Sequence, residues 1–172
     1  LQTYPKLVLD WRRDTARLNV VQEQIDIGVR IGHLADSRLI ARKIGETCEK
    51  IVMAPDLLRR LGKPKDFADL QKNYPLAAVL NHNNGRADTW YINENLQFTP
   101  AKPHFVGSHI HNDLQTALAC NAVSQQLDWM VAQYFLNGQV VEQFAEVPKI
   151  RLPVSIYRPQ RVGTPMRVKV VF

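Results

Sequence analysis

Cysteine is scarce in this chain of 172 residues, which contains only Cys48 and Cys120. The two cysteines are far apart and neither belongs to a Cys-x-x-Cys pattern, so the sequence offers no disulfide framework and no cysteine-rich zinc site. We therefore expect two free thiols in a reducing, cytoplasmic environment. A redox-sensing cysteine pair is the less favoured alternative.

Long hydrophobic runs are also absent. No apolar stretch approaches the ~20 residues that a membrane-spanning helix needs, and the first residues do not have the layout of a signal peptide. We therefore expect no contact with a membrane. The chain begins at Leu1 rather than at a methionine, which predicts that it is a piece of a longer protein.

The motifs of common enzymes are missing as well. The sequence has no G-x-S-x-G elbow, no phosphate-binding loop and no Cys/His arrangement with a recognisable spacing. The 22 Lys and Arg residues against 16 Asp and Glu give a net charge of +6, but they are spread along the chain and form no visible helix-turn-helix or zinc finger. We predict a protein with a basic surface that is not an enzyme and needs no cofactor.

The residues that are present predict a mixed α/β fold with a substantial core. Apolar residues make up 45% of the chain and charged residues 22%, which is typical of a globular protein. Apolar alternation predicts strands, and helical spacing with capping residues predicts helices. Strands are predicted over residues 7–11, 25–31, 39–44, 51–54, 76–80, 90–92, 105–106 and 152–156. Helices are predicted over residues 14–25, 56–61 and 130–136 and from the Thr164–Pro165 cap to residue 172, with two more capped by Asp66 and Asn112. The first strand, first helix and second strand together imply a parallel crossover.

The stretch from Gln24 to Pro55 carries the most specific pattern. The matching residues are Asp26, Arg30, Gly32, Leu34, Asp36, Ser37, Leu39, Ala41 and Arg42, followed by Ala54, Leu58, Gly62 and Pro64. With these residues the chain resembles the effector-binding domain of LysR-type transcriptional regulators, strongly up to Pro64 and more weakly beyond. It departs from the family at Cys120–Ser124, where many members have Gly-x-Gly-Ile-Ala.

The resemblance implies a two-lobed α/β fold similar to that of type 2 periplasmic binding proteins. Residues 1–53 and 151–172 would form lobe I, residues 54–150 would form lobe II, and two hinge strands would join the lobes. Family members also have an earlier first strand and an N-terminal DNA-binding domain, neither of which is in this sequence. A sheet without its first strand would leave backbone groups unpaired, so we expect that this strand lies outside the sequence or that another segment fills its place.

The resemblance also implies a sensor in a bacterial transcriptional regulator. A small-molecule effector, with an anion among the candidates, would bind between the lobes and shift their relative angle. The change would pass through a homodimer or tetramer to a helix-turn-helix domain that binds DNA, and the mild positive charge would favour that binding. We expect the dimer contact at Arg17, Val20 and Val21 on one side and at the helix carrying Leu118 on the other. The solute-binding protein of a transporter, which would require export, is the alternative.

Three residues of lobe I are candidates for effector binding. Gly32 and His33 follow a predicted strand at its carboxyl end, where ligands of open α/β sheets bind. Thr15 lies at the start of the preceding predicted helix, where free backbone N–H groups favour anions. An ordinary loop histidine and a capping threonine are the alternative interpretations, and the resemblance favours ligand contact.

Polar residues in lobe II supply the remaining candidates. The candidate ligand contacts there are Asn81, His82, Ser108, His109, His111 and Asn112. Asn81 and His82 follow the predicted central strand, and a simple polar turn is an equally good interpretation of them. His109, His111 and Asp113 also match the H-x-H-x-D opening of some metallohydrolases, but zinc needs about three protein ligands and no further histidine completes such a site. We therefore predict no metal and keep a metallohydrolase as the least favoured alternative.

Overall fold

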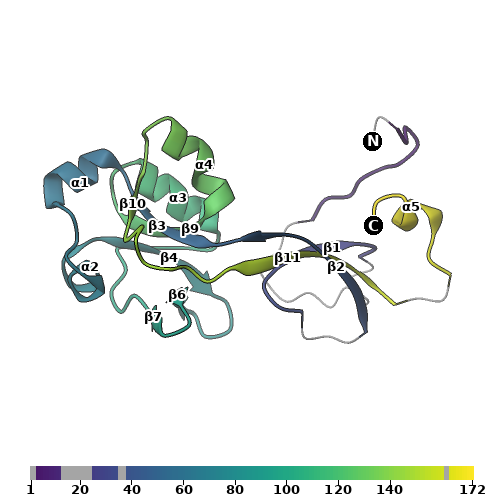
Figure 1. Cartoon of the computed structure of the whole chain (residues 1–172), viewed down its shortest axis with the longest axis horizontal. Helices are drawn as coiled ribbons and strands as arrows, with labels where there is room; N and C mark the ends of the chain where they lie inside the picture. The colour runs from purple at the N-terminus through teal and green to yellow at the C-terminus, as the bar shows by residue number, and fades with distance from the viewer. Residues whose placement is uncertain (1–2, 13–24, 35–37, 161–162) are drawn as a thin grey trace. The chain divides into compact units, whose positions relative to one another are not determined.

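The computed structural model describes residues 3–12, 25–34, 38–160 and 163–172, and it divides into two compact units (Figure 1). Unit 1 comprises Leu1–Glu46 and Leu152–Phe172, and unit 2 comprises Thr47–Arg151. Helices and strands are mixed along the chain, which confirms the predicted α/β class. Within the described ranges, no helix is both long enough and apolar enough to cross a bilayer.

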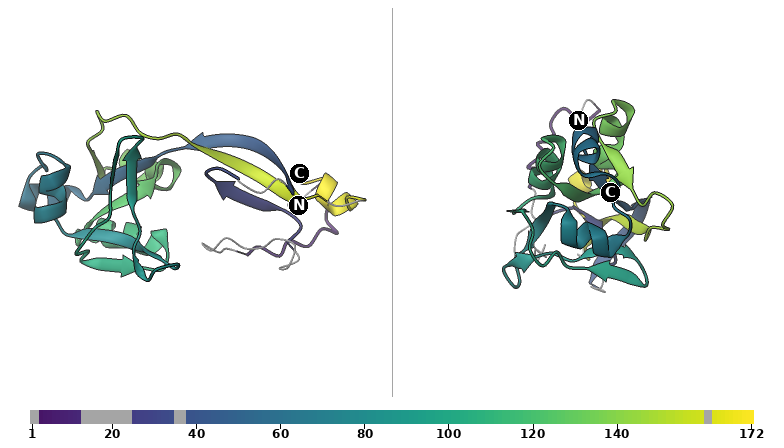
Figure 2. Two further views of the ribbon diagram at one scale, coloured as in Figure 1. Left: turned by 90° about the horizontal axis from the view of Figure 1, so that it is seen from below. Right: turned by 90° about the vertical axis from the view of Figure 1, so that its left-hand side faces the viewer.

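Unit 1 is built on a three-stranded sheet. Its strands are β1 (Gly28–Ile31), β2 (Leu39–Thr47) and β11 (Leu152–Pro159), in the order β1-β11-β2. Strands β2, in blue, and β11, in yellow-green, run alongside each other in Figures 1 and 2. The short helix α5 (Met166–Lys169) follows, and within it Val168 is buried. The helix predicted after the Thr164–Pro165 cap is therefore confirmed, although Pro165 is its N-cap and it ends at Lys169 rather than at Phe172.

Glycine is needed at two positions of unit 1, for a different physical reason at each. In the antiparallel pair of β1 with β11, Gly28 lies opposite Tyr157, and a Cβ on Gly28 would lie 2.3 Å from the Tyr157 ring. Gly32 has no such neighbour, but its φ of 93° lies in the region that side chains rarely adopt. Gly28 therefore permits close packing, whereas Gly32 permits the backbone to bend where β1 ends, while its N–H still donates across to the Pro153 carbonyl of β11 at 2.9 Å.

The strand predicted over residues 7–11 is wrong, because residues 7–12 belong to no strand. Their alternating apolar side chains are largely exposed, with Val8 at 92% and Trp11 at 71%. Alternation gives a preference for extended backbone, but a strand also needs a hydrogen-bonded neighbour. The described part of the chain provides no such neighbour for residues 7–12. Among the described strands, β1 pairs with β11 and the two are antiparallel, so the predicted parallel crossover is not found there. The predicted helix over residues 14–25 lies almost entirely outside the described residues.

Unit 2 contains a larger mixed sheet. Its strands are β3 (Glu49–Met53), β4 (Leu76–Asn81), β5 (Arg86–Ala87), β8 (Phe105–Gly107), β9 (Val123–Leu127) and β10 (Val141–Gln143). The order is β10-β3-β9-β4-β5, and β8 pairs with β4. Strand β4 is parallel to both β8 and β9, whereas β3 is antiparallel to β9 and β10. A hairpin of β6 (Trp90–Asn93) and β7 (Leu96–Phe98) completes the strands.

Four helices connect these strands: α1 (Pro55–Leu61), α2 (Phe67–Asn73), α3 (Ile110–Leu118) and α4 (Asp128–Leu136). Two predicted helix boundaries are confirmed, since Gly62 ends α1 and the Asp66 carboxylate caps α2 by accepting from the Asp69 N–H at 2.7 Å. The predicted Asn112 cap is wrong. The chain already turns after Gly107, so α3 begins at Ile110, with His109 in the extended N-cap position and no side-chain cap.

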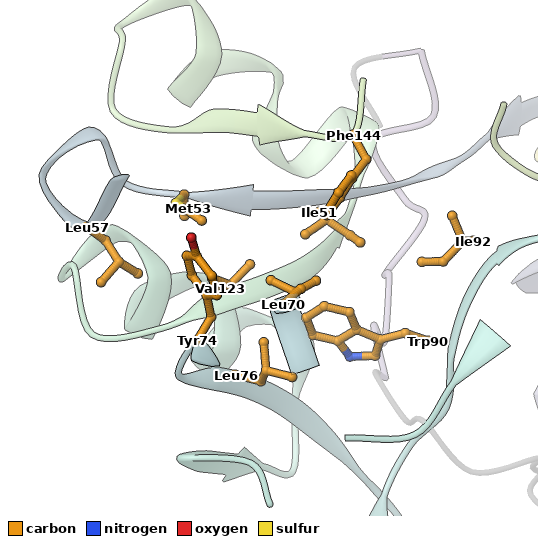
Figure 3. Close-up of a cluster of buried hydrophobic side chains, with 10 residues drawn as sticks. All are labelled: Ile51, Met53, Leu57, Leu70, Tyr74, Leu76, Trp90, Ile92, Val123 and Phe144. Atoms are coloured by element: carbon orange, nitrogen blue, oxygen red, sulfur yellow. The ribbon is translucent and has the colours of Figure 1, made fainter. Parts of the chain in front are cut away.

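The core of unit 2 lies between the sheet and the elements α2 and β6. In Figure 1, α2 and the β6–β7 hairpin lie on one side of the sheet, and α3 and α4 lie on the other. Figure 3 shows the Trp90 indole beside Leu70 and Leu76. Trp90 is 4% exposed and its ring lies 5.2 Å from that of Phe98, in tilted contact. This packing holds the sheet whose carboxyl ends carry most of the predicted site.

Cys120 occupies a position whose backbone favours the glycine found in many family members. It follows α3 and has a φ of 62°, a left-handed backbone conformation that favours glycine and strains other residues. Replacing Cys120 with glycine is therefore expected to raise the free energy of unfolding of unit 2 by about 1 kcal/mol. Ala119 is the matched control, because its φ of −75° suits alanine, and Ala119→Gly should lower stability. Urea unfolding of both variants provides the measurement, and a destabilised Cys120→Gly chain would contradict the strain.

Candidate functional site

The parallel strands of unit 2 bring several predicted residues to one edge of the sheet. Val79 of β4 is paired with Gly107 of β8, so Asn81 and the junction between β8 and α3 lie at the same edge. Strand β9 is also parallel to β4, with Ala77 opposite Ser124, and ends in the same direction. We call the set formed by Asn81, residues 107–113 and the end of β9 the carboxyl edge. Such edges are where ligands of α/β sheets bind.

Asn81 and His82 occupy different positions at this edge. The Asn81 side chain is half-buried and orders the turn that follows, because its Oδ1 accepts from the Asn83 N–H at 3.0 Å and its Nδ2 donates to Asp88 at 3.1 Å. His82 is exposed within that turn. The polar turn that the sequence allowed is therefore present, with Asn81 fixed in place and His82 open to solvent.

The junction between β8 and α3 carries the other predicted residues. Ser108, His111 and Asn112 are exposed, and His109 is half-buried. They form an exposed polar rim around the first turn of α3. A Cβ on the preceding Gly107 would lie 2.9 Å from Asp113 Oδ1, so only glycine allows the helix to approach the strand this closely.

Beneath this rim lie buried polar atoms without partners. Asp113 is 1% exposed and Gln126 is fully buried. Gln126 Nε2 donates to the Ile110 carbonyl at 3.2 Å and to Ser124 Oγ at 3.3 Å, which fixes the orientation of the amide. Among the described residues, Asp113 Oδ1, Gln126 Oε1 and His109 Nδ1 accept or donate no hydrogen bond. Buried polar atoms are usually paired, so three unpaired atoms around one helix start mark a polar site.

Two carboxyl groups of unit 2 have strongly raised pKa values. Burial raises the pKa of Asp113 to about 7. Burial, and to a lesser extent the nearby Asp88 carboxylate, raises the pKa of Glu49 to about 7. Glu49 lies at the start of β3 and is paired with Leu127 at the end of β9, so it belongs to the same end of the sheet. Both groups therefore gain or lose a proton near neutral pH.

Asp113, Gln126 and Glu49 were not among the residues predicted to bind a ligand. The sequence contained a signal for Gln126, because Ser124, Gln125 and Gln126 are consecutive polar residues in β9, all of whose residues are buried. Asp113 was visible only as the last residue of H-x-H-x-D. Its burial depends on how closely α3 approaches Gly107, which no local pattern reveals.

The candidates of unit 1 are a separate group. Gly32 and His33 directly follow β1, and His33 is exposed. The strand is antiparallel to β11, so the expected position at the end of a parallel strand is not found among the described pairings. Thr15 and the proposed dimer residues Arg17, Val20 and Val21 lie outside the described residues.

No group of three or more His, Cys, Asp or Glu residues suited to a metal ion occurs within the described ranges. Both cysteines are free thiols, as the sequence predicts. Cys48 is buried, and burial followed by the adjacent Asp128 carboxylate raises the pKa of its thiol. A raised pKa lowers the thiolate fraction and with it the reactivity of this cysteine.

Comparisons with known proteins give one consistent family. Residues 1–171 match the family described as the LysR substrate binding domain. An uncharacterised HTH-type transcriptional regulator of Haemophilus influenzae is 24% identical over 168 residues, covering 96% of this chain and 57% of the relative. The HTH-type regulator CrgA of Neisseria meningitidis is 24% identical over 147 residues, covering 84% of this chain and 48% of CrgA. The chain thus spans about half the length of these relatives.

Solved structures show the same fold. CrgA of Neisseria meningitidis, a LysR-type transcriptional regulator, superposes with a TM-score of 0.84 at 20% identity, covering 99% of this chain and 57% of CrgA. The regulatory domain of AphB from Vibrio vulnificus gives a TM-score of 0.78 at 19% identity, covering 98% of this chain and 83% of that domain.

Proposed function

Since the chain belongs to the family of LysR substrate-binding domains, we propose that it senses a small-molecule effector for a transcriptional regulator and that the carboxyl edge of unit 2 contacts the effector. The family match confirms the resemblance seen in the sequence and favours a regulator over a transporter's solute-binding protein or a metallohydrolase. The family consists of transcriptional regulators rather than enzymes, and we propose no catalytic activity for this chain.

The polar site around the start of α3 is the observation that carries this proposal. Exposed Ser108, His111 and Asn112 surround a helix start beneath which Asp113 and Gln126 keep unpaired oxygens. Small-molecule sites combine a shaped surface with a few convergent polar groups, and this junction supplies such groups. Asn81 and His82 lie at the same edge and complete the proposed contacts of unit 2.

The remaining parts of the proposal concern the rest of the protein. We assign Thr15, Gly32 and His33 of unit 1 to effector contact as well, and residues 1–53 with 151–172 and residues 54–150 to two lobes of the family fold. The whole protein would bind DNA through an N-terminal helix-turn-helix domain, act as a homodimer or tetramer, and work in the cytoplasm. A ligand shifts such a regulator only if it binds one conformation more tightly than the other.

A thermal-shift screen of small carboxylates, aromatic compounds and amines tests the proposal. An effector is expected to raise the melting temperature of the chain by about 2 °C or more at saturation. His111→Ala should reduce the rise, because His111 lies just past the carboxyl end of β8. His104→Ala is the matched control, since His104 is also exposed but precedes the same strand at its other end. A rise that both variants leave unchanged would exclude the carboxyl edge as the effector site.

A further inference from the structure

Carboxyl groups outnumber basic side chains at the carboxyl edge, where Arg86 of β5, paired with Asn81, is an exposed cation. Glu49, Asp88 and Asp113 contribute carboxyl groups at or next to this edge. Asp88 is tied to it by its hydrogen bond with Asn81, and it acts electrostatically on Glu49. A surface that binds an anion normally presents Arg or Lys to it. At the carboxyl edge, hydrogen-bond acceptors of carboxyl groups predominate instead.

Among the described elements packed against α3, the strands offer Asp113 no unpaired cation, and Arg60 of α1 donates to the Cys120 carbonyl beyond the other end of the helix. Strands β4, β8 and β9 contain only neutral side chains, and β3 contributes Glu49 and Lys50. Lys50 is already paired with Glu142 of β10. On α3 and its cap, His109 and His111 are the other titratable groups. Burial alone accounts for the shifted pKa of Asp113, so none of these neighbours stabilises its charged form.

The unpaired atoms point to the same chemistry. Asp113 Oδ1 and Gln126 Oε1 can only accept hydrogen bonds once Asp113 is ionised, and both are unpaired. Gln126 cannot reverse its amide without placing its oxygen against the Ile110 carbonyl, to which Nε2 now donates. The start of α3 therefore presents two buried oxygens without a donor, and the Gln126 oxygen has a fixed direction.

We propose that the carboxyl edge of unit 2 binds its ligand through a positively charged hydrogen-bond donor, such as a protonated amine, with Asp113 and Gln126 as the acceptors. This inference rests on the function proposed above, and it names a class of ligand other than the anion that the sequence left among the candidates. Because both oxygens are buried, the first turn of α3 must shift to admit the donor. Two charge-assisted hydrogen bonds, one of them to an ionised carboxylate, offset that cost.

A pair of probes with the same shape and opposite charge tests this inference. Propylammonium and propionate are titrated separately into the 172-residue chain at constant ionic strength, with binding followed by amide chemical shifts of residues 107–113. Propylammonium is expected to bind with a dissociation constant of about 1 mM, and propionate far more weakly. Affinity for propylammonium should rise several-fold as the pH increases from about 6 to about 8, because Asp113 ionises in this range.

Variants separate this inference from the proposed function. Asp113→Asn keeps the shape of the side chain and should weaken propylammonium about tenfold, whereas Glu94→Gln, a change at an exposed position of the same unit, should have no effect. Stronger binding of propionate, or propylammonium binding that is independent of both pH and Asp113, would overturn the ligand class and leave the effector site standing. The proposed ligand class would also be overturned if neither propylammonium nor propionate bound at the carboxyl edge. The proposed effector site itself would be overturned only if the thermal-shift screen found no ligand whose effect is reduced by His111→Ala.

Discussion

Replacing Lys149 with methionine is expected to lower the free energy of unfolding of unit 2 by about 2 kcal/mol, because the Lys149 ammonium donates to two backbone carbonyls and faces Glu142. Its side chain is 12% exposed, and Nζ donates to the Phe144 carbonyl at 2.5 Å and to the Val147 carbonyl at 2.6 Å. It also lies 3.6 Å from Glu142, whose side chain is 15% exposed. Methionine fills similar space but leaves the Val147 carbonyl without this donor, whereas the Phe144 carbonyl keeps the Val147 N–H at 3.1 Å and Glu142 keeps Lys50.

The backbone that Lys149 secures is itself strained. Phe144 has a φ of 55°, and its buried ring stacks on Phe67 at a centroid distance of 4.2 Å. Loss of the ammonium should therefore loosen the turn that positions this ring in the core. Urea unfolding followed by tryptophan fluorescence measures the effect, since Trp90 is buried in unit 2. The matched control is Lys72→Met on the exposed side of α2, which should change stability by less than about 0.5 kcal/mol. Equal losses in the two variants would contradict the role of Lys149.

Unit 2 is expected to lose stability as the pH rises from about 5 to about 8, by roughly 3 kcal/mol from Asp113 alone. The pKa of Asp113 is about 7 in the folded chain and 3.8 for the ordinary group. Between these values the folded state holds a proton that the unfolded state has released, so raising the pH favours unfolding. The stabilisation is complete below about pH 4 and is lost as the pH passes 7. Glu49, with a folded pKa of about 7, acts in the same direction.

The variant Asp113→Asn tests whether Asp113 causes this loss of stability with rising pH. Asparagine cannot ionise, so the variant should be more stable than the parent chain at pH 8 and should show a shallower decline between pH 5 and pH 8, with Glu49 accounting for the remainder. Urea midpoints measured across this range, at constant ionic strength, provide the comparison. Glu94→Gln at an exposed position is the control and should leave the slope unchanged. A parent chain whose stability is flat or rising over this range would show that Asp113 is not held protonated.

The sequence predicted an element correctly where nearby residues determine that element, and failed where a distant segment determines it. Helix α2 was predicted correctly because Asp66 supplies its cap within one turn of chain, and α1 because Gly62 can adopt the conformation that ends it. Strand β4 was recognisable as a continuous apolar run. The segment over residues 7–12 was mispredicted because strand formation depends on a distant hydrogen-bonded partner, and its own alternation contains no information about that partner.

The candidate site shows the same distinction. Ser108, His109 and His111 stood out as a polar cluster after a short strand, and the parallel register brings the end of that strand to the same edge of the sheet as Asn81. Asp113 did not stand out, because an aspartate in the first turn of a helix is ordinarily exposed and favourable. Its importance comes from burial against Gly107, a packing distance set by two elements together.

By itself, the sequence determined the α/β class, most of the individual helices and strands, and membership of the LysR substrate-binding family, because these depend on local periodicity, capping and a long matched motif. Only the tertiary structure decided that Asp113 and Gln126 share a buried position, that Lys149 serves the Phe144 turn, and that Cys120 adopts a left-handed conformation. Burial, hydrogen-bond partners and backbone strain arise from contacts between segments distant in the chain, and these contacts set the charge and chemistry of the site.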